Sequence, residues 1–134
     1  EKSHVLPAMM RKFVTAKRNN LSSVELWGTG NPRREFLHVD DLAEACFHIL
    51  LKKNEHSIIN VGTGEDISIK ELAEMIKKVT GFKGKLIWNT NKPDGTPRKL
   101  MEVSKIKNKG WNPKIDLLKG ITSVYNMTSG LNWN

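Results

Sequence analysis

Short segments with strand-like sequence alternate with amphipathic helical segments along this chain, and this alternation allows only a few folds. β-Branched, leucine and tryptophan side chains gather at residues 24–27 and 85–88, whereas apolar residues recur at helical spacing between Ser68 and Gly81. Helices that intervene between strands favour parallel pairing, because a parallel connection needs a long crossover. We therefore predict an α/β fold of short, mostly parallel strands alternating with helices.

The helix after Ser68 has the clearest boundaries. Ser68 and Glu71 have the spacing of a capping box, and Gly81 suits a left-handed C-terminal residue. Asp41 and Glu44 show the acidic form of the capping pattern, before an apolar face that includes Cys46. We expect helices over residues 3–19, 41–52, 68–81, 104–110 and from 116 onward, and strands over residues 24–27, 36–39, 58–61 and 85–88.

Composition limits the class of protein. A chain of 134 residues, 38% hydrophobic and 27% charged, fits one globular domain. Its 22 basic and 14 acidic residues give a net charge of +8, which indicates an anionic partner, either a phosphate compound or a nucleic acid. The single cysteine cannot form an internal disulfide, and no apolar run approaches the roughly 18 residues of a membrane span. We expect a cytoplasmic protein. The sequence begins without methionine and without a signal peptide, which is what we expect of a fragment of a longer chain.

A basic loop follows the first predicted strand. Arg33 and Arg34 come after two glycines and a proline, and guanidinium groups bind phosphate oxygens in pairs. Trp27 at the start of this loop can stack on a sugar or base. The alternatives are a solvated basic turn for the arginines and a core position for the tryptophan, which is the more common place for a lone tryptophan at a strand end.

Histidines and carboxylates near predicted helix starts permit both chemical and structural interpretations. His4 can act as acid or base near neutral pH, or be a surface or capping residue. We interpret His38 as structural. Adjacent Asp40 and Asp41 are hard ligands suited to a metal ion, but their place before an apolar helix favours capping, so no metal site is predicted. On the apolar face, Cys46 is expected to behave as a small hydrophobe.

Two further strings lie downstream. The first, NVGTG at residues 60–64, lacks the spacing of either nucleotide-binding glycine motif, so a strand-to-helix turn explains it. The second, KPDGTPRK at residues 92–99, places Asp94 where it can accept hydroxyl hydrogen bonds, and Arg98 and Lys99 where they can neutralise a diphosphate. An exposed turn is the alternative for this string.

Together with SHVLPAMMRKF and WGTGNPRREFLHVDDLAEA, these strings occur in an order and at intervals that resemble the GDP-L-fucose synthase family of extended short-chain dehydrogenases/reductases. The resemblance covers nearly the whole chain. It implies an NADP-dependent enzyme that epimerises GDP-4-keto-6-deoxy-mannose at C3 and C5 and then reduces C4. It also implies that residues 1–134 are the C-terminal substrate-binding domain, that the Rossmann domain is largely absent, and that this fragment alone is inactive.

The resemblance also implies roles for particular residues. His4 matches the proton donor of epimerisation and a possible cofactor contact. Lys12 stands where the family often has arginine, which keeps the charge but loses the two-pronged fork. The implied substrate contacts are Lys12, Trp27, Arg34 and Lys85, and further Asp94, Arg98 and Lys99. The intact enzyme is expected to bind a GDP-sugar and NADP(H), to be a homodimer, and to bind neither nucleic acid nor membrane.

Two alternatives remain open from the sequence. One is the substrate domain of another NAD(P)-dependent nucleotide-sugar epimerase or dehydratase, since REFLHVDD and NVGTG are shared across the extended reductases. The other is a small basic nucleic-acid-binding module. The second has no recognised nucleic-acid motif and its charge is spread over several segments.

Overall fold

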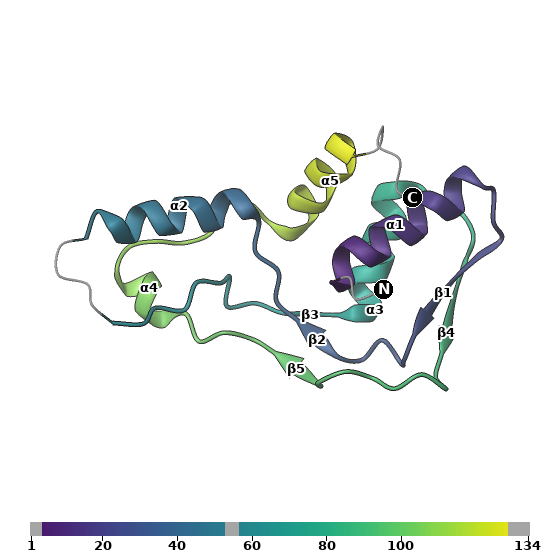
Figure 1. The fold of residues 1–134 in the computed structure, drawn as a ribbon, viewed down its shortest axis with the longest axis horizontal. Coiled ribbons are helices and arrows are strands. Elements are labelled where there is room, and N and C mark those ends of the chain that lie inside the picture. The colour runs from purple at the N-terminus through teal and green to yellow at the C-terminus, as the bar shows by residue number, and fades with distance from the viewer. Residues whose placement is uncertain (1–3, 53–56, 129–134) are drawn as a thin grey trace.

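The computed structural model describes residues 4–52 and 57–128. Their elements in chain order are α1 (Val5–Arg18), β1 (Ser23–Trp27), β2 (Arg33–Arg34), α2 (Val39–Leu50), β3 (Ile67–Ser68), α3 (Ile69–Thr80), β4 (Lys85–Asn89), β5 (Arg98–Lys99), α4 (Ser104–Asn108) and α5 (Leu117–Thr128). The molecule is elongated: α1, α3, α5 and the β1–β4 pair lie at one end and α2 and α4 at the other, with extended chain between them (Figure 1).

The strands form two small sheets. Strands β1 and β4 pair in parallel over five positions, from Ser23 opposite Lys85 to Trp27 opposite Asn89. Strand β2 lies between β3, which is antiparallel to it, and β5, which is parallel. Two of the three pairings are parallel, so the predicted α/β class with mostly parallel short strands is confirmed.

Local sequence signals determine the helix at the centre of the larger core. The Ser68 hydroxyl accepts a hydrogen bond from the Glu71 amide and the Glu71 carboxylate accepts one from the Ser68 amide, which completes the predicted capping box. Gly81 ends α3 with φ of 69°, as predicted. The face of α3 that carries Leu72 and Ile76 packs with α1, β1 and β4 around the fully buried Phe13.

The second core is smaller and lies at the α2 end. It consists of Ala45 from α2, Val103, Ile106 from α4, and Trp111. Several large side chains of α2 and the following segment are exposed instead, among them Phe47 and Leu50. A small buried cluster with exposed apolar neighbours therefore contrasts with the closed core around α1 and α3.

Two predicted strands are absent. Residues 36–38 adopt no regular structure and Val39 already belongs to α2, while residues 58–61 are not assigned to a strand. Both segments have the composition of strands, but within the described residues neither has a partner to complete a backbone ladder. Composition favours a strand, and pairing with another segment decides whether one forms.

The start and the faces of α2 also differ from the prediction. His38 caps the helix, its Nδ1 accepting from the Asp40 amide at 3.2 Å, so the expected Asp41–Glu44 capping box is wrong. The Asp41 carboxylate is instead 2% exposed and accepts from the backbone amides of Lys114 and Ile115 at 3.1 and 3.0 Å. Cys46 is exposed, which corrects its predicted place on the buried face. Only Ala45 of that apolar face is buried, because α2 is covered by few neighbours.

Candidate functional site

The basic loop after β1 and the loop between β4 and β5 enclose a cavity of about 170 Å³. We call it the Trp27 pocket. Its lining residues are Val5, Trp27, Gly30, Pro32, Arg34, Ile69, Pro93, Asp94 and Gly95. Three residues predicted as substrate contacts, Trp27, Arg34 and Asp94, thus meet in one cavity although up to 67 positions separate them in the chain.

Trp27 ends β1 and is 64% exposed, so it is not a core residue. Two cations lie over its ring: Nζ of Lys12 is 5.8 Å and Nζ of Lys92 is 5.3 Å from the ring centroid. Lys12 also donates to the backbone carbonyl of Glu25 at 2.9 Å. An exposed indole bordered by positive charge can stack on a planar or sugar ring while the lysines attract phosphate.

The two adjacent arginines have different environments. Arg33 Nε donates to Oδ1 of Asp66 at 2.6 Å, so its charge is engaged within the fold. Arg34 Nη1 donates to the Arg33 carbonyl at 2.7 Å. Across residues 4–52 and 57–128 no carboxylate pairs with Arg34, which leaves most of its donors for an anion.

Asp94 is fixed by the loop opposite it. Thr29 donates from its amide to Oδ1 at 2.8 Å and from its hydroxyl to Oδ2 at 2.6 Å. These hydrogen bonds lower the pKa of the Asp94 carboxyl, first through the Thr29 side chain and then through its amide. The carboxylate is therefore ionised at neutral pH and has a fixed orientation at the pocket wall.

Arg98 and Lys99 form β5, next to the pocket loop. Arg98 Nε pairs with Oδ2 of Asp66, whose side chain is 4% exposed. Asp66 thus joins Arg33 on β2 to Arg98 on β5, and the hydrogen bonds from Arg33 and then Arg98 lower its pKa. The guanidinium of Arg98, predicted to neutralise a diphosphate, is engaged in this clamp, whereas Lys99 is exposed.

Lys85 does not join this group. It begins β4 opposite Ser23, whereas Trp27 lies opposite Asn89 at the other end of the ladder. Four residues of strand correspond to about 13 Å at 3.3 Å per residue. The structure therefore places Lys85 at the far end of the β1–β4 pair from the Trp27 pocket.

His4 immediately precedes α1 and is exposed. Its side chain makes no capping hydrogen bond, so the capping interpretation is wrong. The next residue, Val5, lines the Trp27 pocket. His4 is therefore next in sequence to a residue that lines the Trp27 pocket.

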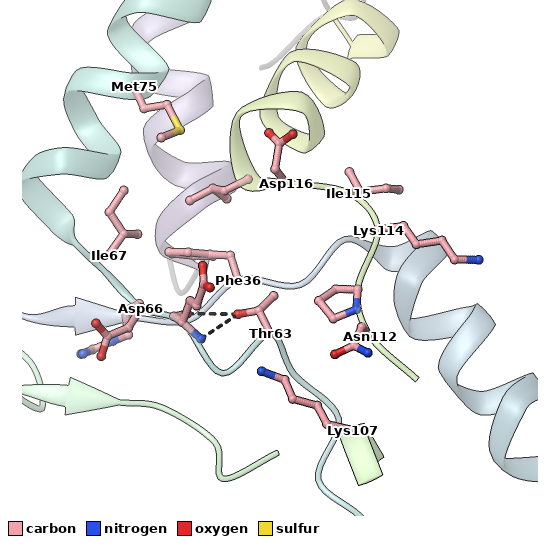
Figure 2. Close-up of a pocket in the computed structure, with 14 residues that line it drawn as sticks. Phe36, Thr63, Asp66, Ile67, Met75, Lys107, Asn112, Lys114, Ile115 and Asp116 are labelled. Carbon is pink, nitrogen blue, oxygen red and sulfur yellow. Dashed lines mark hydrogen bonds between the residues drawn. The ribbon is translucent and has the colours of Figure 1, made fainter. Parts of the chain in front are cut away.

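A wider cavity of about 560 Å³ shares Arg34 with the Trp27 pocket. Its lining combines apolar side chains such as Phe36 and Met75 with charged ones such as Asp66 and Lys107 (Figure 2). Nearby, Glu35 accepts from the Gly64 amide at 2.7 Å and the Met101 amide at 2.9 Å. This contact explains the NVGTG string as a turn bound by a carboxylate.

Sequence reasoning missed Thr29 and Lys92. Thr29 lies between two glycines in the first loop and Lys92 begins the KPDGTPRK string. Neither had a spacing signal, because their partners Asp94 and Trp27 are 65 residues away along the chain.

The described residues contain neither a candidate metal site nor a membrane-spanning helix. Among residues 4–52 and 57–128 no group of three or more histidine, cysteine, aspartate or glutamate side chains is arranged to hold a metal ion. In the same residues, no helix has both the length and the apolar character needed to cross a membrane.

Comparison with known proteins identifies the class. Residues 1–62 match the model of the NAD dependent epimerase/dehydratase family. The solved GDP-mannoheptose C4 reductase from Campylobacter jejuni with NADP bound is 43% identical, with a TM-score of 0.77 over 94% of this chain and 45% of that one. The first 62 residues of the chain thus resemble this family, and the likeness to the solved reductase extends over nearly the whole chain.

The chain is also similar to proteins named GDP-L-fucose synthase. It is 57% identical to putative GDP-L-fucose synthase 2 of Arabidopsis thaliana over 93% of its length, and 46% identical to the GDP-L-fucose synthase of Escherichia coli (strain K12) over 92%. These matches span 38% and 41% of the two relatives. The chain thus corresponds to about two fifths of the length of the relatives it matches.

Proposed function

We propose that this chain is the substrate-binding domain of a longer GDP-L-fucose synthase, which converts GDP-4-keto-6-deoxy-mannose into GDP-L-fucose. The observation that carries the proposal is the meeting of Trp27, Arg34 and Asp94 in one pocket, in a chain 57% identical to a protein with that name. The net charge of +8 is consistent with a diphosphate ligand.

Each pocket residue has a role that its environment supports. Arg34, with no carboxylate partner in the described part of the chain, binds the diphosphate. Trp27 stacks on a ring of the nucleotide sugar, and Lys12 adds positive charge beside it. Asp94 accepts hydrogen bonds from hydroxyl groups of the ligand. Lys99 contributes to the surrounding positive charge, whereas Arg98 acts through its pairing with Asp66. Lys85, at the other end of the β1–β4 pair, would contact a part of the ligand that extends beyond the Trp27 pocket.

His4 donates the proton in epimerisation. When a base removes the proton from C3 or C5, next to the C4 ketone, an enolate forms, and the protonated imidazole of His4 can return a proton to the same carbon. NADPH, when bound, supplies the hydride for reduction at C4. The sequence has no GxGxxG loop, and the sheets among the described residues have two and three strands, so these residues do not build a dinucleotide site. His4 is proposed only as a contact at the edge of the bound NADPH.

We infer that the whole protein is a cytoplasmic homodimer that binds neither nucleic acid nor membranes, and that residues 1–134 are inactive alone. A GDP-heptose C4 reductase is the second candidate, supported by the 43% identity to the Campylobacter structure. This second candidate would act on a different GDP-sugar and bind it in the same Trp27 pocket.

His4→Gln in the full-length protein tests the proposed chemistry. We expect epimerisation to slow by about 10²–10⁴-fold, the usual contribution of general acid–base catalysis. Reduction of an already epimerised 4-ketone should keep most of its rate. Solvent deuterium incorporation at C3 and C5 measures the first step and NADPH absorbance the second. Equal losses in both steps would show that His4 is structural or positions the cofactor, and turnover of a GDP-heptose alone would favour the second candidate.

A further inference from the structure

Thr29 contacts both oxygens of a pocket carboxylate. Its amide lies 2.8 Å from Oδ1 of Asp94 and its hydroxyl 2.6 Å from Oδ2. Two donors from one residue determine the plane of the carboxylate as well as its position. The two residues lie in different loops, one after β1 and one between β4 and β5, so the contact joins the two walls of the Trp27 pocket.

The hydroxyl of Thr29 has a defined direction. Its oxygen accepts a hydrogen bond from the Asn31 amide at 3.2 Å, and its proton is therefore available to Asp94. The backbone beneath is also shaped for this contact. Gly28 has φ of 79°, and a Cβ there would lie 2.2 Å from Oδ1 of Asp94. Glycine is needed at this position both for the conformation and for the close approach of the carboxylate.

The contact leaves Asp94 able to bind a ligand. A carboxylate offers about four acceptor directions, and Thr29 occupies two of them. Asp94 lines the same cavity as Arg34, so one wall presents a negative group and the other a positive group. A negative carboxylate accepts from hydroxyls and repels phosphate, which directs the diphosphate toward Arg34.

Two further contacts hold the rest of the 92–95 loop against the opposite wall of the Trp27 pocket. Lys92, two residues before Asp94, lies over the Trp27 ring at 5.3 Å. Gly95, the residue after Asp94, lies against Arg34, because a Cβ there would be 3.2 Å from Nη2. The 92–95 loop thus contacts Trp27, Thr29 and Arg34 in succession. The Thr29 bonds also keep the pKa of Asp94 low, so the group stays ionised.

We propose that Thr29 is a positioning residue for ligand binding: it orients the Asp94 carboxylate so that its remaining acceptor sites receive hydroxyl groups of a nucleotide sugar in the Trp27 pocket. This inference rests on the proposed function, since it takes the GDP-sugar as the ligand. It adds a residue whose own atoms need not touch the substrate.

Thr29→Val and Thr29→Ser in the full-length protein provide the test. Valine keeps the shape and the amide bond but removes the hydroxyl, whereas serine retains it. We expect Thr29→Val to raise the KM for GDP-4-keto-6-deoxy-mannose about 3–10-fold with kcat within twofold, as for loss of one hydrogen bond that orients a binding group. Thr29→Ser should stay within twofold of the wild type, and so should Thr15→Val, an exposed threonine of α1.

A double-mutant cycle separates positioning from a direct role. If Thr29 acts only through Asp94, Thr29→Val should add nothing to the KM of Asp94→Asn. Additive losses, equal damage from the serine and valine variants, or an unchanged KM in Thr29→Val would overturn the inference. The wild-type protein reports separately on the proposed function: absence of any turnover of the GDP-sugar would overturn that function, and this inference with it.

Discussion

The two ends of the molecule are built to different degrees of completeness. At the α1–α3 end, twelve buried residues form a closed core, and the Trp27 pocket lies on the loops that this core supports. At the α2 end, only four buried residues form a cluster, and large apolar side chains such as Phe47 remain exposed. Both ends expose some large apolar side chains, but those at the pocket end surround a closed core, whereas those at the α2 end lie over a small cluster.

This difference explains where ligand-binding groups are found. Trp27, Arg34 and Asp94 are fixed by contacts between loops that leave and enter the larger core, so their geometry is set by the chain itself. The Asp66 clamp joins Arg33 of β2 to Arg98 of β5. Strands β2, β3 and β5 lie in the middle of the molecule, between its two ends (Figure 1). A binding site on a rigid support loses less affinity to reorganisation.

The largest test of this contrast compares one large buried side chain from each core. Phe13→Ala should lower the free energy of unfolding by about 3–5 kcal/mol, because the ring is fully buried in a core that cannot collapse around the gap. Ile106→Ala should cost less, about 2 kcal/mol, because the removed side chain is smaller than that of Phe13 and its cluster has fewer buried residues. Urea unfolding of the full-length protein, followed by tryptophan fluorescence, measures both.

Trp111 lies in the small cluster and Trp88 packs against the larger core. In a Trp88→Phe variant, Trp111 reports on the small cluster, and in a Trp111→Phe variant, Trp88 reports on the larger core. A loss for Ile106→Ala equal to or above that for Phe13→Ala would contradict the contrast between the two cores.

A smaller test concerns the Asp66 clamp between the two ends. The lowered pKa of folded Asp66 means that its contribution to stability is complete above the unfolded pKa, near 3.9, and is lost as the pH falls toward the lower folded value. The stability difference between wild type and Asp66→Asn should therefore be largest near pH 7 and shrink below about pH 4. Thermal unfolding across this range measures it. A difference that stays constant or grows on acidification would show that Asp66 is not held as a carboxylate.

Local signals made part of this structure predictable. The Ser68–Glu71 box, Gly81 and the strands at 24–27 and 85–88 depend on neighbouring residues, and the structure has them within two residues of the prediction. The strands expected at 36–39 and 58–61 depend on a pairing partner that composition does not reveal. The exposure of Cys46 likewise depends on which face of α2 finds a neighbour.

The sequence predicted several residues that form the candidate site, but not which of them pair with one another within the fold. Trp27, Arg34 and Asp94 came from short strings and the structure brings them together. The pairing of Arg98 with Asp66, 32 residues away, and of Asp94 with Thr29, 65 residues away, could not be derived from spacing. The adjacent Arg33 and Arg34 are alike in sequence, and the position of Asp66 distinguishes Arg33, which it pairs with, from Arg34, which is proposed to bind the ligand.

Calorimetric titration of the full-length protein with GDP shows whether the Trp27 pocket binds the diphosphate of a GDP-sugar through Arg34, as we propose. Arg34→Met should weaken binding about 10–100-fold, as expected for loss of a charge-assisted pair of hydrogen bonds to phosphate. Arg34→Lys should fall between the two, and Lys83→Met, an exposed lysine remote from the pocket, should bind like the wild type. Equal affinity of Arg34→Met and the wild type for GDP would contradict the account.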